Sequence, residues 1–366
     1  MMTTEVLLES LLSPTTVVTL LLVLPLLHGS TRRLLETWLA KLQLMLTPAI
    51  PSNGPPPTVA GLYMYPVKSL QAVELETAEV DDCGFVKDRR LMLVCPSPPP
   101  TYGFLPKDAT HRFITQRQCP QLATVTATYL SNELLRLSCK GKSMTIHLKY
   151  DAAKQPVYRA RLWDNIVEVV DMGDEVADFF QEIVNTEDAL FMGIRLTQQV
   201  SKQYAPEKYV PPEARTMWGT TPKASLTDGF PILIACEASL DEINRRLRKK
   251  GKEPIPMSRF RPNVVIRNTK AFEEDTWKVI QIGSAQFHIV KGCPRCKQSC
   301  TDQKTGQVFD EPLATLADFR AVGRSTEDVY FAQNAIAYGS FVSKDDAVRV
   351  IKTGDPVWDK EDVKPE

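Results

Sequence analysis

VIQIGSAQFHIV (residues 279–290) is the stretch that decides the fold class. It leads into GCPRCKQSCTDQKTG (residues 292–306), which holds the densest group of cysteines in the chain. Residues 279–290 alternate apolar and polar side chains, and this period of two predicts β-strands with one buried face. The strand pattern leads directly into Cys293, Cys296 and Cys300, three of the eight cysteines of the chain. Cysteines this close together in a chain with few others are typical of metal or redox chemistry, so the end of this strand is the predicted functional site.

The rest of the chain also shows many short strand patterns and few helix patterns. Helices are predicted at 173–184, at 312–320, and from a capping box of Ser239 and Glu242 to about Gly251. This mixture favours an α+β fold, predominantly β, built from small barrels or sheets rather than a doubly wound sheet. The further predicted strands span 59–67, 91–94, 122–129, 134–139, 143–148, 264–266 and 348–357.

Length and charge narrow the class of protein. The 366 residues are enough for two domains, and 43% of them are hydrophobic, so the chain can bury a normal core. Lys plus Arg and Asp plus Glu number 44 each. The absence of a basic excess argues against nucleic-acid binding. The five cysteines outside the cluster are scattered, which indicates a reducing compartment rather than a secreted disulfide framework.

Residues 1–46 form a separate predicted unit. Residues 6–27 are rich in Leu and Val and are about 22 residues long, roughly one bilayer crossing. Arg32 and Arg33 follow at once, which favours an uncleaved signal anchor with its C-terminal side in the cytosol. Leucines at helical spacing after the anchor predict a membrane-surface helix. A buried or amphipathic N-terminal helix is the alternative, and residues 47–58, rich in Pro and Gly, form a linker.

The cysteine cluster allows three interpretations on its spacing alone. Structural zinc and iron–sulfur sites need four protein ligands, and no second Cys-x-x-Cys pair completes Cys293 and Cys296. Inert packing of the cysteines is the second interpretation. The third is a single thiolate at Cys296, flanked by Arg295 and Lys297, whose positive charge favours ionised sulfur. Such a thiolate could be a nucleophile, or the one protein ligand of a soft metal otherwise held by a cofactor.

A second constellation consists of cations at strand ends. Lys68 and Ser69 follow one predicted strand, Arg89 begins another, and Arg261 leads into a third. Such cations are suited to holding phosphate, because Arg can donate two parallel hydrogen bonds. Each of these signals is weak by itself, since most surface cations are simply solvated.

Taken together and in order, these residues resemble those of MOSC-domain proteins with a MOSC N-terminal β-barrel domain, and among them the mitochondrial amidoxime-reducing component. The resemblance covers about residues 57–360. It implies a MOSC N-terminal β-barrel-like domain over 59–197, a MOSC β-barrel domain over 198–366, and an N-terminal membrane-anchor helix. The motifs are YPVKS at 65–69, DRR at 88–90, TQRQ at 115–118, DGFP at 228–231, EASL at 237–240, FRPN at 260–263, the Cys-x-x-Cys pair with Asp302, and GDPV at 354–357.

The resemblance also implies a cofactor, molybdenum bound to molybdopterin. By position Cys296 is the implied molybdenum ligand and catalytic residue, and Cys293 is dispensable to ligation. Ala332 and Cys300 depart from the more usual Gly and Thr of the family, which leaves the shape of the substrate open. The implied cofactor-binding residues are Lys68, Ser69, Arg89 and Arg261 for the pterin and its phosphate, Gly229 and Phe230 as a backbone contact, Pro294 and Arg295 beside the ligand, and Asn334, where the family carries Tyr or Asn.

The implied activity is reduction of N-hydroxylated substrates such as amidoximes, hydroxylamines and N-oxides. The chain has no G-x-G-x-x-G fingerprint and no Cys-x-x-Cys-His haem motif, so its electrons must come from elsewhere. The resemblance implies a b-type cytochrome served by an NADH-dependent flavin reductase. It places the chain on the cytosolic side of a membrane, the mitochondrial outer membrane before other membranes. The alternatives are a molybdenum-cofactor carrier or sulfur-transfer module without its own reductase turnover, and a zinc-stabilised binding protein.

Overall fold

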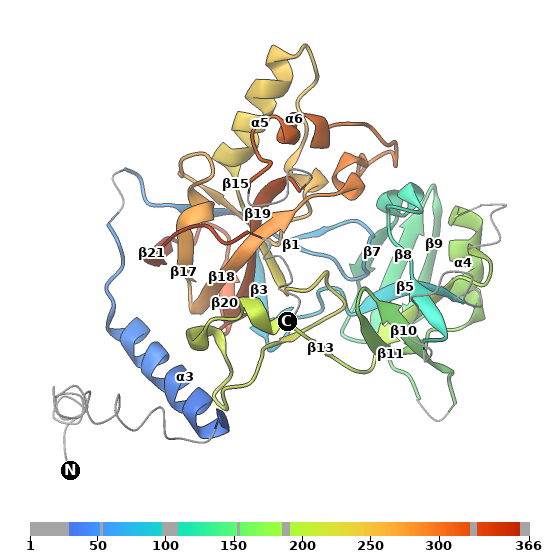
Figure 1. Cartoon of the computed structure of the whole chain (residues 1–366). Coiled ribbons are helices and arrows are strands. Elements are labelled where there is room, and N and C mark those ends of the chain that lie inside the picture. The colour runs from blue at the N-terminus through green and yellow to red at the C-terminus, as the bar shows by residue number, and fades with distance from the viewer. Residues whose placement is uncertain are drawn as a thin grey trace, which may run out of the picture.

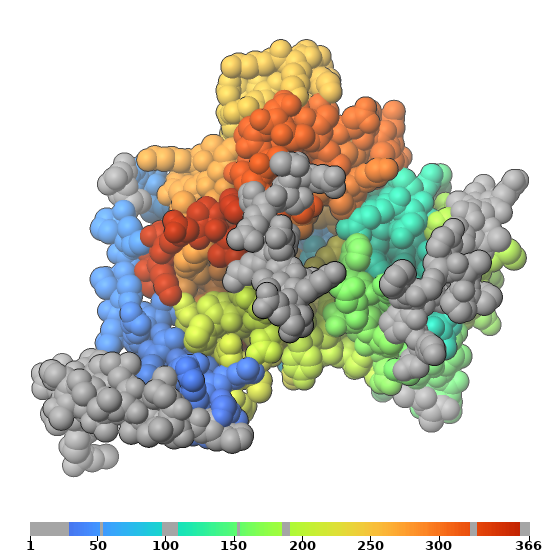
Figure 2. Space-filling view, viewed as in Figure 1, coloured from blue at the N-terminus to red at the C-terminus, as the bar shows by residue number. Residues whose placement is uncertain are grey.

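The computed structural model describes residues 29–51, 54–96, 109–151, 154–184, 191–322 and 328–358. Two β-rich bodies lie side by side with few helices around them, which confirms the predominantly β class (Figure 1). The apolar run at 6–27, predicted as a membrane anchor, lies outside the described residues. No helix in the described part of the chain combines the length and the apolar character needed to cross a membrane. Helix α3 (Gly29–Leu46) lies at one edge of the molecule (Figure 2).

The first body is a closed barrel with the strand order β10-β11-β12-β5-β6. Strands β6 and β10 close it by parallel pairing. Alternation along β5 puts Met92 inside the barrel and Leu93 on its outer face, where α4 (Asp174–Val184) and a three-stranded sheet cover it. The strands are β5 (Leu91–Pro96), β6 (His111–Phe113), β10 (Val157–Leu162), β11 (Asn165–Asp171) and β12 (Arg195–Gln199), and the outer sheet is β7 (Thr126–Tyr129), β8 (Leu134–Cys139) and β9 (Lys142–His147).

The second body is an eight-stranded sheet of order β2-β1-β16-β15-β19-β18-β17-β21, with one parallel pair, β15 and β16. Its ends approach each other, because Val59 N donates to Asp346 O (3.0 Å) and Val348 N to Pro57 O (2.8 Å). The second predicted barrel is a curved eight-stranded sheet that an isolated bridge between Thr58 and Ala347 brings nearly to closure. The strands are β1 (Thr58–Met64), β2 (Val73–Leu75), β15 (Ile232–Cys236), β16 (Val264–Arg267), β17 (Trp277–Ile282), β18 (Ala285–Pro294), β19 (Tyr330–Tyr338) and β21 (Val348–Thr353).

Strand pairing cuts across the order of the chain. Strand β1 precedes the barrel in sequence but pairs with β16. Strands β3 (Thr77–Asp81) and β4 (Gly84–Phe85) likewise join β20 (Phe341–Ser343). The predicted boundary between 59–197 and 198–366 follows the chain, whereas the sheets bring residues 58–85 onto the C-terminal body. The chain thus crosses between the bodies twice, and residues from both meet at their junction.

Two local predictions were wrong. Helix α5 (Glu237–Lys249) begins before the predicted capping box, and its N-cap is Cys236. Ser239 lies inside the first turn because its hydroxyl serves tertiary partners: it donates to Glu274 Oε2 (2.8 Å) and accepts from Phe272 N (2.8 Å). The start of the strand predicted at 122–129 is the end of a 3₁₀-helix, Pro120–Thr124. A short helix, α6 (Leu313–Ala317), does form where 312–320 predicts one.

Candidate functional site

A cavity of about 690 Å³ lies where the two bodies meet. Loops around the large sheet and residues of β15, β18 and β19 form most of its wall, and the barrel side contributes Arg117 and the β10–β11 turn at Trp163. The structure brings every predicted site residue to this one cavity. These are Lys68, Ser69, Arg89, Gly229, Phe230, Arg261, Pro294, Arg295, Cys296 and Asn334.

Cys296 lies two residues after the end of β18 and is the N-cap of the 3₁₀-helix Lys297–Cys300. Its sulfur accepts a hydrogen bond from Arg117 Nε at 3.0 Å. Arg295, which the sequence places beside Cys296, donates instead to Cys293 Sγ (2.7 Å) and to the Phe260 carbonyl (2.6 Å). The cation that contacts the sulfur of Cys296 therefore comes from a residue 179 positions earlier.

Arg117 belongs to a charged chain along the cavity wall. Its guanidinium lies 4.5 Å from the centre of the Trp163 ring, and Nη2 is 3.7 Å from Asp228 Oδ2. Trp163 Nε1 donates to Asp228 Oδ1 (2.9 Å), and Lys68 forms an ion pair with the same carboxylate. Burial alone would raise the pKa of Asp228, but Lys68 and Arg117 outweigh it and hold that pKa well below its usual range. The carboxylate therefore stays ionised and fixes both cations.

Burial lowers the pKa of the Lys68 amine, and Asp228 opposes this effect. The ammonium also donates to the Leu226 carbonyl (2.9 Å). Lys68 is thus held in a single place at the cavity wall, rather than solvated as a typical surface lysine would be.

A stack of three side chains forms another part of the wall. The guanidinium groups of Arg89 and Arg261 lie 4.4 and 4.3 Å from the centre of the Tyr65 ring. Arg89 is neutralised by Asp88 (2.5 Å), whereas burial lowers the pKa of Arg261 to about 10. Within the described residues no carboxylate pairs with Arg261, whose Nη1 donates to the neutral Gln303 Oε1 (2.9 Å). This leaves one buried cation available to an anionic ligand.

Three predicted site residues hold a strained backbone. Ser69 (φ 72°), Arg89 (φ 48°) and Arg261 (φ 56°) lie in the left-handed region that residues with a Cβ seldom adopt. Each such residue costs of order 1–3 kcal/mol unless its surroundings hold it there, and such strain clusters at ligand sites. Gly229 (φ 117°) occupies the same wall without this cost.

Several buried polar atoms that line the cavity lack a partner in the described part of the chain. They are Ser69 Oγ, Thr227 Oγ1, Arg259 Nε, Arg261 Nη2 and Arg295 Nε. A buried donor without a partner costs about 1–3 kcal/mol, so native proteins seldom retain one without a reason. Three of these five atoms are guanidinium nitrogens that can only donate, and the other two are hydroxyls that can donate. Together they fit an oxygen-rich anionic ligand.

The remaining predicted residues occupy less polar positions. Phe230 is buried against the edge of the Tyr209 ring, with 6.2 Å between ring centres. Asn334, on β19, donates to the Gly292 carbonyl at 3.4 Å, a long bond that a ligand could replace. Pro294 is the last residue of β18, the strand that pairs with β19. These residues contribute to the shape of the cavity rather than to its charge.

The other cysteines of the cluster are engaged elsewhere. Cys293 accepts from Arg295, and Cys300 is buried with its sulfur 3.4 Å from the Asp310 carbonyl. Burial raises the pKa of the Cys300 thiol. No three His, Cys, Asp or Glu side chains around Cys296 converge as a metal-binding group among the described residues. The geometry thus gives no support to a structural zinc or iron–sulfur site.

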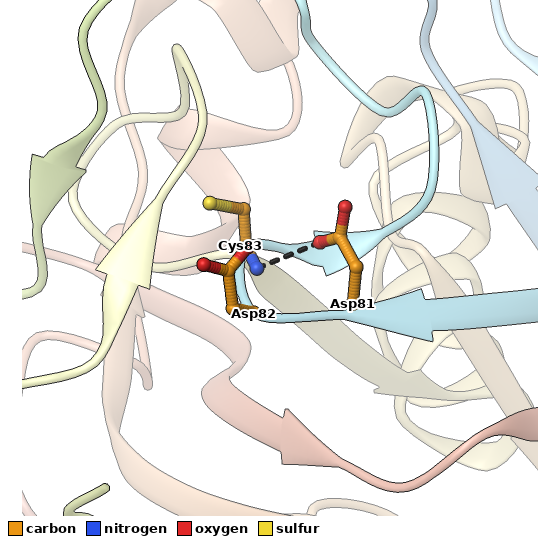
Figure 3. A group of neighbouring side chains, drawn as sticks. All are labelled: Asp81, Asp82 and Cys83. Carbon is orange, nitrogen blue, oxygen red and sulfur yellow. Dashed lines mark hydrogen bonds between the residues drawn. The ribbon is translucent and has the colours of Figure 1, made fainter.

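One convergent group lies away from the cavity, at the β3–β4 turn. Asp81, Asp82 and Cys83 bring their ligand atoms within 4.8 Å of one another (Figure 3). Arg90 binds both oxygens of Asp81 (2.9 and 2.7 Å). Burial would raise the pKa of Asp82, but hydrogen bonds from Lys202 and Lys223 lower it to about 2. Protein cations therefore already satisfy these carboxylates.

Sequence reasoning missed Arg117, Trp163 and Asp228 as site residues. Arg117 and Asp228 lie within two motifs of the resemblance, TQRQ and DGFP, so a signal was present. Trp163 had no such signal in the sequence. It occupies an ordinary hairpin turn, which becomes part of the site because the second body lies against it.

Comparison with known proteins agrees with this architecture. The sequence matches the MOSC N-terminal beta barrel domain at residues 56–187 and the MOSC domain at 221–358. Mitochondrial amidoxime reducing component 2 of Rattus norvegicus is 33% identical over 310 residues, covering 82% of each chain, and that of Homo sapiens is 30% identical over 309 residues, covering 82% of this chain and 83% of the relative. A molybdenum cofactor sulfurase of Oryza sativa subsp. japonica is 28% identical over 277 residues, covering 71% of this chain and 30% of the relative. The chain therefore belongs to the MOSC-domain proteins of the mitochondrial amidoxime reducing component family.

Proposed function

We propose that this chain is a molybdenum-cofactor-dependent oxidoreductase that reduces N-hydroxylated compounds such as amidoximes, hydroxylamines and N-oxides. The observation that carries the proposal is the position of the Cys296 sulfur, which lies in the wall of a cavity rich in buried, unpartnered donors. One soft ligand beside an anion-binding wall suits a cofactor that joins a metal to a phosphate.

The residues present fit such a cofactor. Cys296 would hold the metal, since its thiolate is the soft ligand at the cavity wall. Ser69, Arg261 and Lys68 would hold the pterin and its phosphate together with Arg89, because their donors converge there. Gly229, Phe230, Pro294, Arg295 and Asn334 would complete the cradle.

When bound, the cofactor supplies two-electron oxygen transfer from the N–O bond. The chain supplies position and charge. Arg117 fixes the sulfur of Cys296 from one side, and Asp228 fixes Arg117. Trp163 lies against the Arg117 guanidinium at the edge of the cavity and donates to Asp228, so it helps to hold Arg117 and Asp228 in place.

Electrons would come from a b-type cytochrome and its NADH-dependent flavin reductase. The relatives are named mitochondrial components, which supports a mitochondrial location for this chain. The apolar run at 6–27 supports attachment to the outer membrane with the folded part in the cytosol.

Turnover tests the proposal. The full chain, purified from a host that makes molybdopterin, is supplied with the cytochrome, the reductase and NADH, and NADH oxidation is followed with an aromatic amidoxime. We expect amidoxime-dependent oxidation with the amidine as product. Molybdenum without turnover, together with a persulfide on Cys296 in mass spectra, would instead support the carrier or sulfur-transfer role that the sulfurase relative suggests. A chain that binds no molybdenum contradicts both.

A further inference from the structure

Helix α3 turns its apolar side chains away from the protein. It buries Thr37 and Leu44 against the body, while Trp38 is 59% exposed and Met45 83% exposed. Residues 38 and 45 lie two helical turns apart and share one face. Leu39 and Leu46 flank this face and are exposed as well. The apolar face of α3 therefore lacks a protein partner among the described residues.

A loop from a distant part of the chain adds to this surface. Met217 and Trp218 are 67% and 79% exposed at the tip of a turn that follows the 3₁₀-helix Pro212–Ala214. The turn is closed by hydrogen bonds between Thr216 and Thr220 (N to O, 3.0 Å, and 2.5 Å between the hydroxyls). The two large apolar side chains are therefore presented by a defined turn.

Gly219 sets this turn directly against the start of α3. It has a φ of 70°, and a Cβ there would lie 3.3 Å from Leu34 N. Figure 1 shows the loop beside the N-terminal end of the helix. The turn with residues 217–218 thus lies beside α3, which carries residues 38–46, at one edge of the molecule. We call these residues the apolar edge.

Specific contacts fix α3 in this orientation. Arg33 pairs with Glu207 (2.8 Å), and Leu44 packs with Val279 and Ile351. Lys41 lies over the Tyr338 ring, 5.4 Å from its centre. Because the opposite face of α3 is occupied by these contacts, the helix would have to break them to bury its apolar face.

We propose that the apolar edge inserts into the surface of a lipid bilayer, so that the folded body rests on the membrane through α3 and the 216–220 turn. The apolar run at 6–27 ends two residues before α3 begins, which brings the edge to a membrane wherever that run binds one. Exposed apolar patches of this kind mark interaction sites, and an amphipathic helix with Trp on its apolar face suits the bilayer interface. The proposal does not depend on the proposed reaction.

Charge on the edge points to apolar insertion rather than to attraction by anionic lipids. Arg32 pairs with Glu36 (2.9 Å) and Arg33 with Glu207, so these cations are already neutralised. Contact with the bilayer should therefore form on phosphatidylcholine alone and persist in high salt.

Tryptophan fluorescence tests the contact without a contribution from the anchor, because residues 1–28 contain no tryptophan. The full chain is reconstituted into phosphatidylcholine vesicles with and without brominated acyl chains, which quench tryptophans that enter the bilayer. Trp38→Phe and Trp218→Phe should each remove part of the quenched emission, and the double variant nearly all of it. Trp163→Phe is the matched control, since Trp163 is 40% exposed but lies at the cavity.

Each other outcome overturns the proposal. Quenched emission that survives in the double variant, or that Trp163→Phe removes equally, means that the edge is not in the bilayer. Loss through Trp38→Phe alone means that the turn takes no part. Absent quenching with a blue shift that grows with protein concentration assigns the edge to a second copy of the chain. A blue shift that does not depend on protein concentration would mean that other residues of the same chain cover the apolar edge.

Discussion

Arg117 Nε donates a hydrogen bond to Cys296 Sγ over 3.0 Å, although the two residues are 179 positions apart and come from different bodies of the molecule. The proposed metal ligand is thus on the large sheet, while the cation that holds it is delivered with the barrel. The site is complete only when the two bodies are docked.

This relationship predicts the effect of Arg117→Met. The substitution keeps much of the side-chain volume but removes the charged hydrogen bond, which is worth about 1.5–3 kcal/mol, or roughly 10- to 150-fold in an equilibrium. We expect the full chain to lose molybdenum that much faster during dialysis, as followed by elemental analysis. Arg117→Lys should rescue part of the loss. Arg136→Met, at an exposed position of β8, is the control. Equal rates in all four proteins would show that Arg117 does not hold the sulfur.

We expect that Ser69 lowers the stability of the chain in favour of ligand binding. Its φ of 72° and its buried, unpartnered hydroxyl both cost free energy in the ligand-free chain. Ser69→Ala removes the hydroxyl and Ser69→Gly also relieves the backbone, so the unfolding free energy should rise by about 1 kcal/mol and about 2 kcal/mol, respectively. Thermal unfolding of the cofactor-free full chain measures this, at roughly 1–2 °C per kcal/mol for a protein of this size. A less stable Ser69→Ala chain would mean that the hydroxyl has a partner in the protein.

Glu274 predicts a pH dependence of stability. Burial raises the pKa of Glu274 to about 7, and Asp275 adds to the rise. The folded chain then keeps a proton between about pH 4.5 and 7 that the unfolded chain releases, so this group makes unfolding easier as pH rises. At 1.36 kcal/mol per pKa unit the effect is roughly 3 kcal/mol.

Urea unfolding of Glu274→Gln checks this prediction. The variant cannot titrate at this position. Its free energy of unfolding, relative to that of the wild type, should therefore rise by roughly 3 kcal/mol between pH 5 and pH 8. Because every other group is common to both proteins, the difference isolates Glu274. Glu79→Gln, at an exposed position of β3, should show no such trend. Parallel stability curves for Glu274→Gln and the wild type would show that the carboxyl is ionised in the fold.

The sequence predicted elements whose cause is local, and it failed where the cause is tertiary. The strand predicted at 134–139 coincides with β8 because alternation alone defines it. The start of α5 was wrong because the hydroxyl of Ser239 serves Glu274 and Phe272 instead of capping the helix. No local pattern reveals those partners.

The site shows the same division. Cys296 could be predicted as a site residue because its neighbours in sequence are unusual, and Lys68, Arg89 and Arg261 because they lie in ordered motifs. Trp163 was missed because its role arises from contact with Arg117 and Asp228. The left-handed backbone of Ser69 was equally hidden, since no glycine marks the position.

Elemental analysis of the full chain, purified from a host that makes molybdopterin, tests the central claim most directly. We predict about one molybdenum per chain in the wild type and in Cys293→Ser, which keeps Cys296, and none in Cys296→Ser, with the three proteins unfolding at similar temperatures. Molybdenum at the wild-type level in a folded Cys296→Ser chain, or zinc or iron in place of molybdenum in the wild type, would contradict the account.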